Sequence, residues 1–303
     1  MGSGVTTATS TAREALDRLA LFFAQRPTRQ GLLAREALGR PAEGDAELRD
    51  RLVDRLRGET RLDGSVGGAA LPTIWRAHEL IDLGHGGGAS GTLRVMGWVM
   101  SLAGKPGAFG EGCAEPRHQH RACAHWLGGF FSPAPPEQRV APITFPSGKV
   151  FRAEAAARFA VSCLALRAAV RAGYEAWPAI QAHLIGLGRL EGEWEKWGSY
   201  YTPDLVASGL TGLAGASAPH AVAAHRVSAT IAAHQEPDGT WAQADLFHVL
   251  EALTWTATVP ARTALRRALP ALVQRQRPDG SFPGPAREER ALIALRVLLA
   301  ADA

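Results

Sequence analysis

The sequence predicts an all-α fold assembled from repeated pairs of helices, and three observations lead to it. A short motif of Gln, Gly and an aromatic residue recurs, and Gly280 of its last copy follows Gly239 of the preceding copy by 41 residues. The segments between copies carry apolar residues at helical spacing and are rich in Ala, Leu and Arg, which favour helices. The sequence lacks runs of alternating β-branched residues, which would indicate strands.

The two clearest copies of the motif are Gln235-Glu-Pro-Asp-Gly239-Thr-Trp241 and Gln276-Arg-Pro-Asp-Gly280-Ser-Phe282. Both contain Pro-Asp-Gly, a turn signal, because Pro presets φ and Gly accepts a positive φ. Four weaker copies precede them: Asp63-Gly64-Ser-Val66, Pro106-Gly107-Ala-Phe109, Ser147-Gly148-Lys-Val150 and Glu191-Gly192-Glu-Trp194. Each unit is expected to run helix, turn, helix, so that six units give about twelve helices.

Helical spacing is clearest in five segments between the turns, namely 46–57, 93–102, 153–172, 221–234 and 263–275. An additional amphipathic helix is expected over 11–25, packed on the rim of the repeats. The segment 132–147, with five prolines, is the most irregular stretch. The predicted organisation is an N-terminal helical extension, 1–45, followed by a repeat domain, 46–303.

Composition narrows the class of protein. The chain has 33 Lys and Arg residues and 29 Asp and Glu residues, which gives a net charge of +4. The basic residues are dispersed along the sequence, which argues against nucleic acid as a partner. A hydrophobic content of 46% fits a folded protein with a large core and excludes disorder. Three cysteines do not make a disulfide scaffold. No secretory signal or membrane-spanning stretch is recognised, and a cytoplasmic location is expected.

The recurring Gln-x3-Gly-x-aromatic pattern resembles that of the α/α-toroid superfamily, which includes squalene–hopene cyclases, other class II terpene cyclases and the β subunits of protein prenyltransferases. The resemblance covers 46–303 and implies six helix pairs closed into a ring around a central cavity. An open helical solenoid is the alternative, because its repeats have a similar length. In a toroid the inner helices begin after the turns, so their N-termini gather around one mouth, which favours anions.

A dense polar cluster follows the second turn and is a candidate zinc site. It contains Cys113, His118, His120 and Cys123, which are the residue types that bind zinc. The resemblance to prenyltransferase β subunits places His118 and His120 at two of that family's ligand positions. Polar residues of an exposed loop, with Cys123 as a core thiol, are the alternative interpretation.

Two aspartates are candidate proton donors. Class II terpene cyclases use the middle Asp of an Asp-x-Asp-Asp motif, which this sequence lacks. The nearest analogue is Thr202-Pro203-Asp204-Leu205, and Asp245 lies six residues after Gly239. Each Asp could instead cap a helix and stabilise its dipole.

Carbocation chemistry would also need aromatic walls, because ring faces stabilise cations. Several rings fall near the starts of inner helices and are the predicted substrate-binding residues, although ordinary core packing is the alternative for each. They are Trp75, Trp126, Tyr200, Tyr201 and Phe247.

The function predicted is that of a terpene cyclase-like isomerase or prenyltransferase-like transferase acting on a small, apolar, isoprenoid-type substrate in the central cavity. Acid-initiated and zinc-assisted mechanisms both remain open. The alternatives are a zinc-dependent enzyme similar to lanthionine cyclases and a non-catalytic toroid that binds a peptide or lipid. Residues 19–23 could contact a membrane peripherally or pack in the core. The sequence leaves open whether a second subunit exists.

Overall fold

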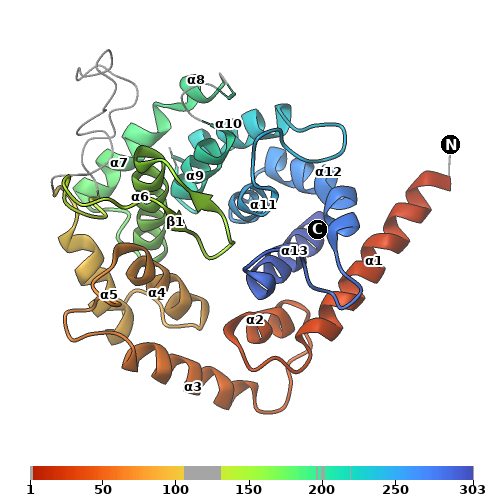
Figure 1. Cartoon of the computed structure of the whole chain (residues 1–303), viewed down its shortest axis with the longest axis horizontal. Coiled ribbons are helices and arrows are strands. Elements are labelled where there is room, and N and C mark those ends of the chain that lie inside the picture. Colours follow the sequence, from red (N-terminus) through yellow and green to blue (C-terminus); the bar gives the residue numbers. More distant parts are fainter. Residues whose placement is uncertain (1–2, 106–130, 196, 199–201, 219, 303) are drawn as a thin grey trace.

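The computed structural model describes residues 3–105, 131–195, 197–198, 202–218 and 220–302. Within these residues the chain forms twelve helices of nine or more residues, one four-residue helix and one short hairpin. This confirms the predicted all-α toroid. The helices form two concentric rings, which Figure 1 shows in the view down the shortest axis.

The inner ring consists of α2 (Arg29–Ala37), α4 (Ala70–Asp82), α6 (Glu154–Arg171), α9 (Pro203–Leu213), α11 (Leu246–Thr254) and α13 (Arg287–Asp302). The outer helices are α1 (Ser3–Phe23), α3 (Asp45–Gly58), α5 (Ser90–Ser101), α7 (Pro178–Gly188), α10 (His220–Ala233) and α12 (Val259–Arg275). Each outer helix packs on an inner one, and consecutive inner helices from α4 to α13 pack on one another. The helix α13 also packs on α2, which brings the two ends of the chain together.

The N-terminal segment takes a place that differs from the prediction. The sequence assigns 1–45 to an extension beside six repeats in 46–303. In the structure α1 packs on α12 and α13, and α2 lies in the inner ring beside α13. Gly107 and Gly148 both fall between α5 and α6 in the sequence, so 46–303 supplies five helix pairs and α1 with α2 supplies the sixth.

The turns before α11 and α13 are fixed by the Gln and aromatic residues of the motif. Nε2 of Gln235 donates to the carbonyl oxygens of Gly239 and Ala264, each at 2.9 Å, and Nε1 of Trp241 donates to the carbonyl of Ile231 at 2.8 Å. Gly239 has a φ of +85°, and a side chain there would meet the backbone of α12. The turn therefore ties an outer helix to the next outer helix and sets where the inner helix begins.

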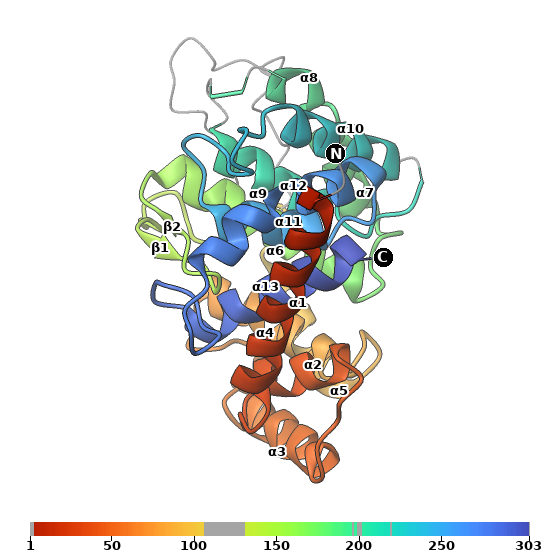
Figure 2. The ribbon, with the colours of Figure 1, turned by 90° about the vertical axis from the view of Figure 1, so that its right-hand side faces the viewer.

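Two of the weaker motif copies adopt other structures. Gly192 lies in the four-residue helix α8 (Glu191–Trp194), where no Pro-Asp precedes it to set a turn. Gly148 is in the turn of an antiparallel hairpin between β1 (Ile143–Thr144) and β2 (Val150–Phe151), which the sequence did not predict. In Figure 2 this hairpin lies on the left, at the opposite side of the molecule from the C-terminus.

A continuous hydrophobic core fills the space between the two rings. It includes three large aromatic side chains that are fully buried, Trp194, Phe159 and Phe282. Trp194 packs so closely on α9 that a Cβ at Gly209 would lie 2.5 Å from its ring. In the part of the chain that the structure describes, none of the helices has both the length and the apolar character needed to span a membrane.

Candidate functional site

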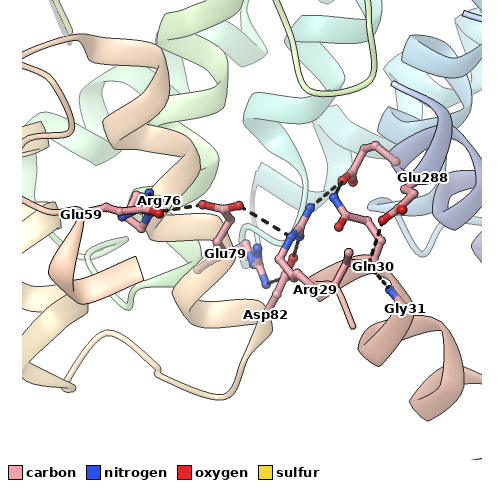
Figure 3. A network of polar contacts seen from close by, with 11 residues as sticks. Arg29, Gln30, Gly31, Glu59, Arg76, Glu79, Asp82 and Glu288 are labelled. Atoms are coloured by element: carbon pink, nitrogen blue, oxygen red, sulfur yellow. Dashed lines mark hydrogen bonds and ion pairs between the residues drawn. The ribbon is translucent and has the colours of Figure 1, made fainter. Parts of the chain in front are cut away.

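A network of ion pairs links four inner helices, α2, α4, α6 and α13. Arg29, at the start of α2, pairs with Asp82 of α4 and with Glu289 of α13, each at 2.6 Å. Asp82 also pairs with Arg171 of α6 at 2.7 Å. Figure 3 shows Arg29 between the carboxylates of α4 and the first turn of α13. Although burial opposes it, the charges of Arg171 and Arg29 lower the pKa of Asp82, so this carboxylate is ionised. These pairs bridge α2 and α4 and close the ring.

A row of rings and guanidinium groups extends from this network. Trp75 and His78, one turn apart on α4, have ring centroids 5.6 Å apart, and His78 stacks on Trp255 with the ring planes 8° apart. The guanidinium carbon of Arg167 lies 4.0 Å from the centroid of Trp255. Burial, followed by the charges of Arg171 and Arg167, holds the pKa of His78 well below its usual value. His78 is therefore neutral at physiological pH.

Glu251, in the second turn of α11, is a buried carboxyl group inside the ring. Its Oε1 has no hydrogen-bond partner among the residues that the structure describes. Burial, with a further contribution from the charge of Glu289, raises the pKa of Glu251 to about 8, even though Arg296 and Arg167 oppose the shift. Glu251 is therefore mainly protonated at neutral pH, which is the state that a general acid needs.

Two guanidinium groups on opposite walls of the ring lack a counter-ion within the described residues. Arg167 of α6 is 7% exposed; its Nη1 makes one long hydrogen bond of 3.4 Å to the carbonyl of Ala214, and its Nε has no partner. Arg296 of α13 is half-buried, and no carboxylate of the described chain lies within ion-pair distance of its guanidinium. Burial, with the charge of Arg171, lowers the pKa of Arg167 to about 9, so the group stays positive at neutral pH.

The two predicted acid residues lie together at the mouth, where α9 and α11 begin. Asp204 forms an ion pair with Lys149 of the hairpin, and its Oδ1 accepts the backbone N–H of Asp245 at 2.9 Å. Asp245 caps α11 by accepting the N–H of His248 at 3.1 Å and pairs with Arg290 at 3.5 Å. Both carboxylates thus have cationic partners and fix the mouth; the catalytic role assigned to them from the sequence stays a prediction.

His248 is held beneath the hairpin. Its Nε2 lies 3.0 Å from the Ser208 hydroxyl and 3.2 Å from the carbonyl of Asp204, while the rings of Phe145 and Phe151 meet it edge to face. Burial lowers the pKa of His248, which makes it neutral. These contacts attach the hairpin to α9 and α11.

A pocket of about 370 Å³ opens at the mouth. Trp75 and Glu289 line it together with Gln30 of α2, Pro146 of the hairpin and the residues that precede and begin α13. Its wall therefore touches the start of the ring row through Trp75 and the ion-pair network through Glu289.

The remaining predicted site residues divide into two groups. Phe247 is buried against Phe282, with ring centroids 5.2 Å apart, and Arg290 lies over it, so its position is that of a core residue. The others lie outside the described residues: Cys113, His118, His120, Cys123, Trp126, Tyr200 and Tyr201. Within the described residues no group of three or more His, Cys, Asp or Glu side chains is placed to hold a metal ion, and zinc binding stays a prediction.

The residues that form the interior site were missed in the sequence, although a common signal marks them. Glu251, Arg167 and Arg296 are each a single charged residue within an apolar helical run, namely Leu-Phe-His-Val-Leu-Glu-Ala-Leu, Cys-Leu-Ala-Leu-Arg-Ala-Ala and Ala-Leu-Ile-Ala-Leu-Arg-Val-Leu. A charge in such a run must face a partner, a ligand or water. The interior is consequently more charged than the oily cavity that the sequence predicted.

Comparison with solved structures places the fold. The chain is similar to a protein from Actinoplanes, with 18% identity and a TM-score of 0.55 over 98% of this chain and 100% of the other. It is also similar to variants of the type II terpene cyclase MstE from Scytonema, at 13% identity. The complex with geranylgeranyl dihydroxybenzoate (substrate) has a TM-score of 0.58 over 98% of this chain and 99% of that one. The complex with merosterolic acid A (product) has a TM-score of 0.56, with 98% of each chain covered. No protein-family model and no curated protein matches the sequence.

Proposed function

We propose that this chain is a terpene cyclase-like enzyme that isomerises an isoprenoid-type substrate by acid-initiated chemistry, with Glu251 as the proton donor. The observation that carries the proposal is that Glu251 is buried inside the toroid and that its Oε1 has no hydrogen-bond partner among the described residues. This burial raises the pKa of Glu251 to about 8, so the carboxyl group is mainly protonated at neutral pH. The likeness in fold to a type II terpene cyclase supports the same substrate class.

The chemistry needs no cofactor. The Glu251 proton adds to one carbon of an alkene, and the π electrons form the new C–H bond, which leaves a carbocation on the other carbon. A second alkene of the same molecule attacks this cation and forms the ring bond. Loss of a proton from the cyclised cation returns a proton to the Glu251 carboxylate, so that the product is an isomer of the substrate. Because donation requires the protonated acid, the pKa near 8 sets the pH above which the rate falls.

The assignment of Glu251 rests on a contrast with the aspartates at the mouth. Asp204 forms an ion pair with Lys149, which fastens the hairpin to the start of α9. Asp204 therefore serves best in this proposal as a positioning residue for the hairpin. Glu251 has no ion pair in the described part of the chain, and burial raises its pKa to about 8, which is the environment that keeps a carboxylic acid neutral.

The test is product formation from geranylgeranyl dihydroxybenzoate, which is the substrate in a neighbouring structure. We expect an isomer of equal mass and different retention time in the wild-type reaction at pH 7. E251Q should lose at least about 100-fold of the rate, because a general acid contributes factors of that size. E47Q, which changes an exposed glutamate of α3, is the matched control. An E251Q variant that folds and turns over normally would reject Glu251 as the acid, and D204N then tests the earlier prediction.

A further inference from the structure

We infer that the ring interior holds a subsite for a carboxylate group of the ligand, formed by the facing guanidinium groups of Arg167 and Arg296. The inference rests on the proposed function for its isoprenoid chain but concerns a different part of the ligand. A long apolar molecule that carries a carboxylate is thus the substrate class that the interior fits.

The described side chains leave the interior of the ring with an excess of positive charge. Four arginines reach it, namely Arg29, Arg167, Arg171 and Arg296. Asp82 and Glu289 pair with Arg29 and Arg171, whereas His78 is neutral and Glu251 is mainly protonated at neutral pH. Two positive charges on opposite walls therefore remain without a counter-ion among the described residues.

Burial of the Arg167 guanidinium without a counter-ion in the described chain costs stability. A buried guanidinium that lacks a counter-ion loses its hydration without an equivalent interaction. The Trp255 face and a single 3.4 Å contact to the Ala214 carbonyl compensate this loss only in part, and Nε has no acceptor within the described chain. A ligand that supplies oxygen acceptors would complete the coordination.

Two guanidinium groups suit a carboxylate better than a diphosphate. A planar guanidinium matches the two oxygens of a carboxylate, and groups on two walls can hold one carboxylate between them. After Glu251 donates its proton, its carboxylate and the single carboxylate of the ligand together balance the two positive charges of Arg167 and Arg296. A diphosphate carries more negative charge than two guanidinium groups neutralise.

A row of aromatic side chains leads from the mouth pocket towards Arg167. The rings of Trp75, His78 and Trp255 form a row from the mouth pocket to Arg167. Trp75 and Trp255 are both half-buried, and His78 between them is buried. The row marks the direction in which an apolar chain would extend from the mouth pocket for its carboxylate end to reach Arg167.

The experiment compares geranylgeranoate with its methyl ester by isothermal titration calorimetry on the full chain. We expect the acid to bind about 10- to 100-fold more tightly than the ester, as for a charge-assisted hydrogen-bonded pair. Arg167→Met and Arg296→Met should each reduce this preference towards unity while ester binding persists. Arg51→Met, at an exposed arginine of α3 away from the mouth pocket, should leave it unchanged.

The other outcomes overturn the inference. Equal binding of acid and ester, or binding of neither, removes the subsite, and tighter binding of geranylgeranyl diphosphate than of the acid rejects the carboxylate. The melting temperature of ligand-free Arg167→Met distinguishes a ligand site from a structural role. If Arg167 serves a ligand, loss of its unpaired buried charge should raise the melting temperature, and if it serves the fold, the melting temperature should fall. E251Q should bind the acid like the wild type. Acid-selective binding without any isomer formation would contradict the proposed function and leave this subsite standing.

Discussion

The mouth and the interior of the ring use charge in different ways. At the mouth each charged side chain that we describe has a partner: Lys149 pairs with Asp204, Arg290 with Asp245 and Arg26 with Glu288. In the interior Arg167 and Arg296 have no counter-ion in the described chain, and Glu251 keeps its proton. Matched charges fasten helices to one another, whereas unmatched buried charges cost stability and mark a place where a ligand or a reaction supplies the missing partner.

The largest expected effect comes from breaking a matched pair. Arg29→Met leaves the carboxylates of Asp82 and Glu289 buried without their shared cation and separates α2 from α4. We expect the free energy of unfolding to fall by about 3–5 kcal/mol, as for other buried pairs that lose one partner. Denaturant unfolding measures it, and a loss below about 1 kcal/mol would contradict the role of this network in closing the ring.

The pH dependence of stability tests the state of Glu251. Its pKa is raised from 4.5 to about 8 on folding, so between these values the unfolded chain has lost a proton that the native chain retains. Stability should therefore fall by about 4 kcal/mol from this group as the pH rises from about 5 to about 8, and should level off above that. E251Q should lack this component. An identical pH profile in both proteins would mean that Glu251 is ionised in the native state.

The contact between Trp194 of α8 and Gly209 of α9 should give an effect of intermediate size on stability. Gly209→Ala places a methyl group 2.5 Å from the ring of Trp194, which is fully buried and has little room to move. The expected loss is about 1–3 kcal/mol, as for overpacked cores. Gly97→Ala on α5 is the control, because nothing lies within 4 Å of a Cβ there. Equal stability of the two variants would show that α9 and α8 can separate freely.

The unmatched arginine should respond in the opposite direction from Arg29. Arg167→Met retains an apolar chain over Trp255 and removes a buried charge that lacks a counter-ion. We expect a gain of about 1 kcal/mol in the free energy of unfolding. A loss similar to that of Arg29→Met would show that Arg167 belongs to the structural network.

The smallest effect is expected at the exposed rim. Arg287 and Asp279 pair at 3.0 Å with about half of each side chain exposed. Arg287→Gln should change the free energy of unfolding by less than about 0.5 kcal/mol, because solvent screens such pairs. A larger change, measured at low and high salt, would show that the turn before α13 depends on this contact.

The sequence predicted the helices and their pairing well because both depend on local signals. Apolar spacing placed 46–57, 153–172 and 221–234 within one residue of α3, α6 and α10. Pro-Asp-Gly correctly located the turns before α11 and α13, because Gly239 and Gly280 both adopt the positive φ that glycine accepts most easily. The place of α1 and α2 was missed, since ring closure depends on contacts between residues more than 250 positions apart, such as Arg29 with Glu289.

The candidate site was less predictable, for a related reason. The search for a known acid motif led to Asp204 and Asp245 at helix starts, where a carboxylate is also favoured by the helix dipole. Whether a carboxyl group is protonated depends on its surroundings in three dimensions. Glu251 and Glu289 are 38 positions apart, yet the charge of Glu289 contributes, after burial, to raising the pKa of Glu251. A lone charge in an apolar inner helix was the available signal.

A thermal-shift measurement on the wild type and Arg167→Met, each with and without geranylgeranoate, tests the central claim most directly. The claim is that the unmatched interior charges serve a ligand rather than the fold. The account predicts that the free variant melts at a higher temperature than the free wild type and that the ligand stabilises only the wild type. Destabilisation of the free variant, together with an equal ligand-induced shift in both proteins, would contradict it.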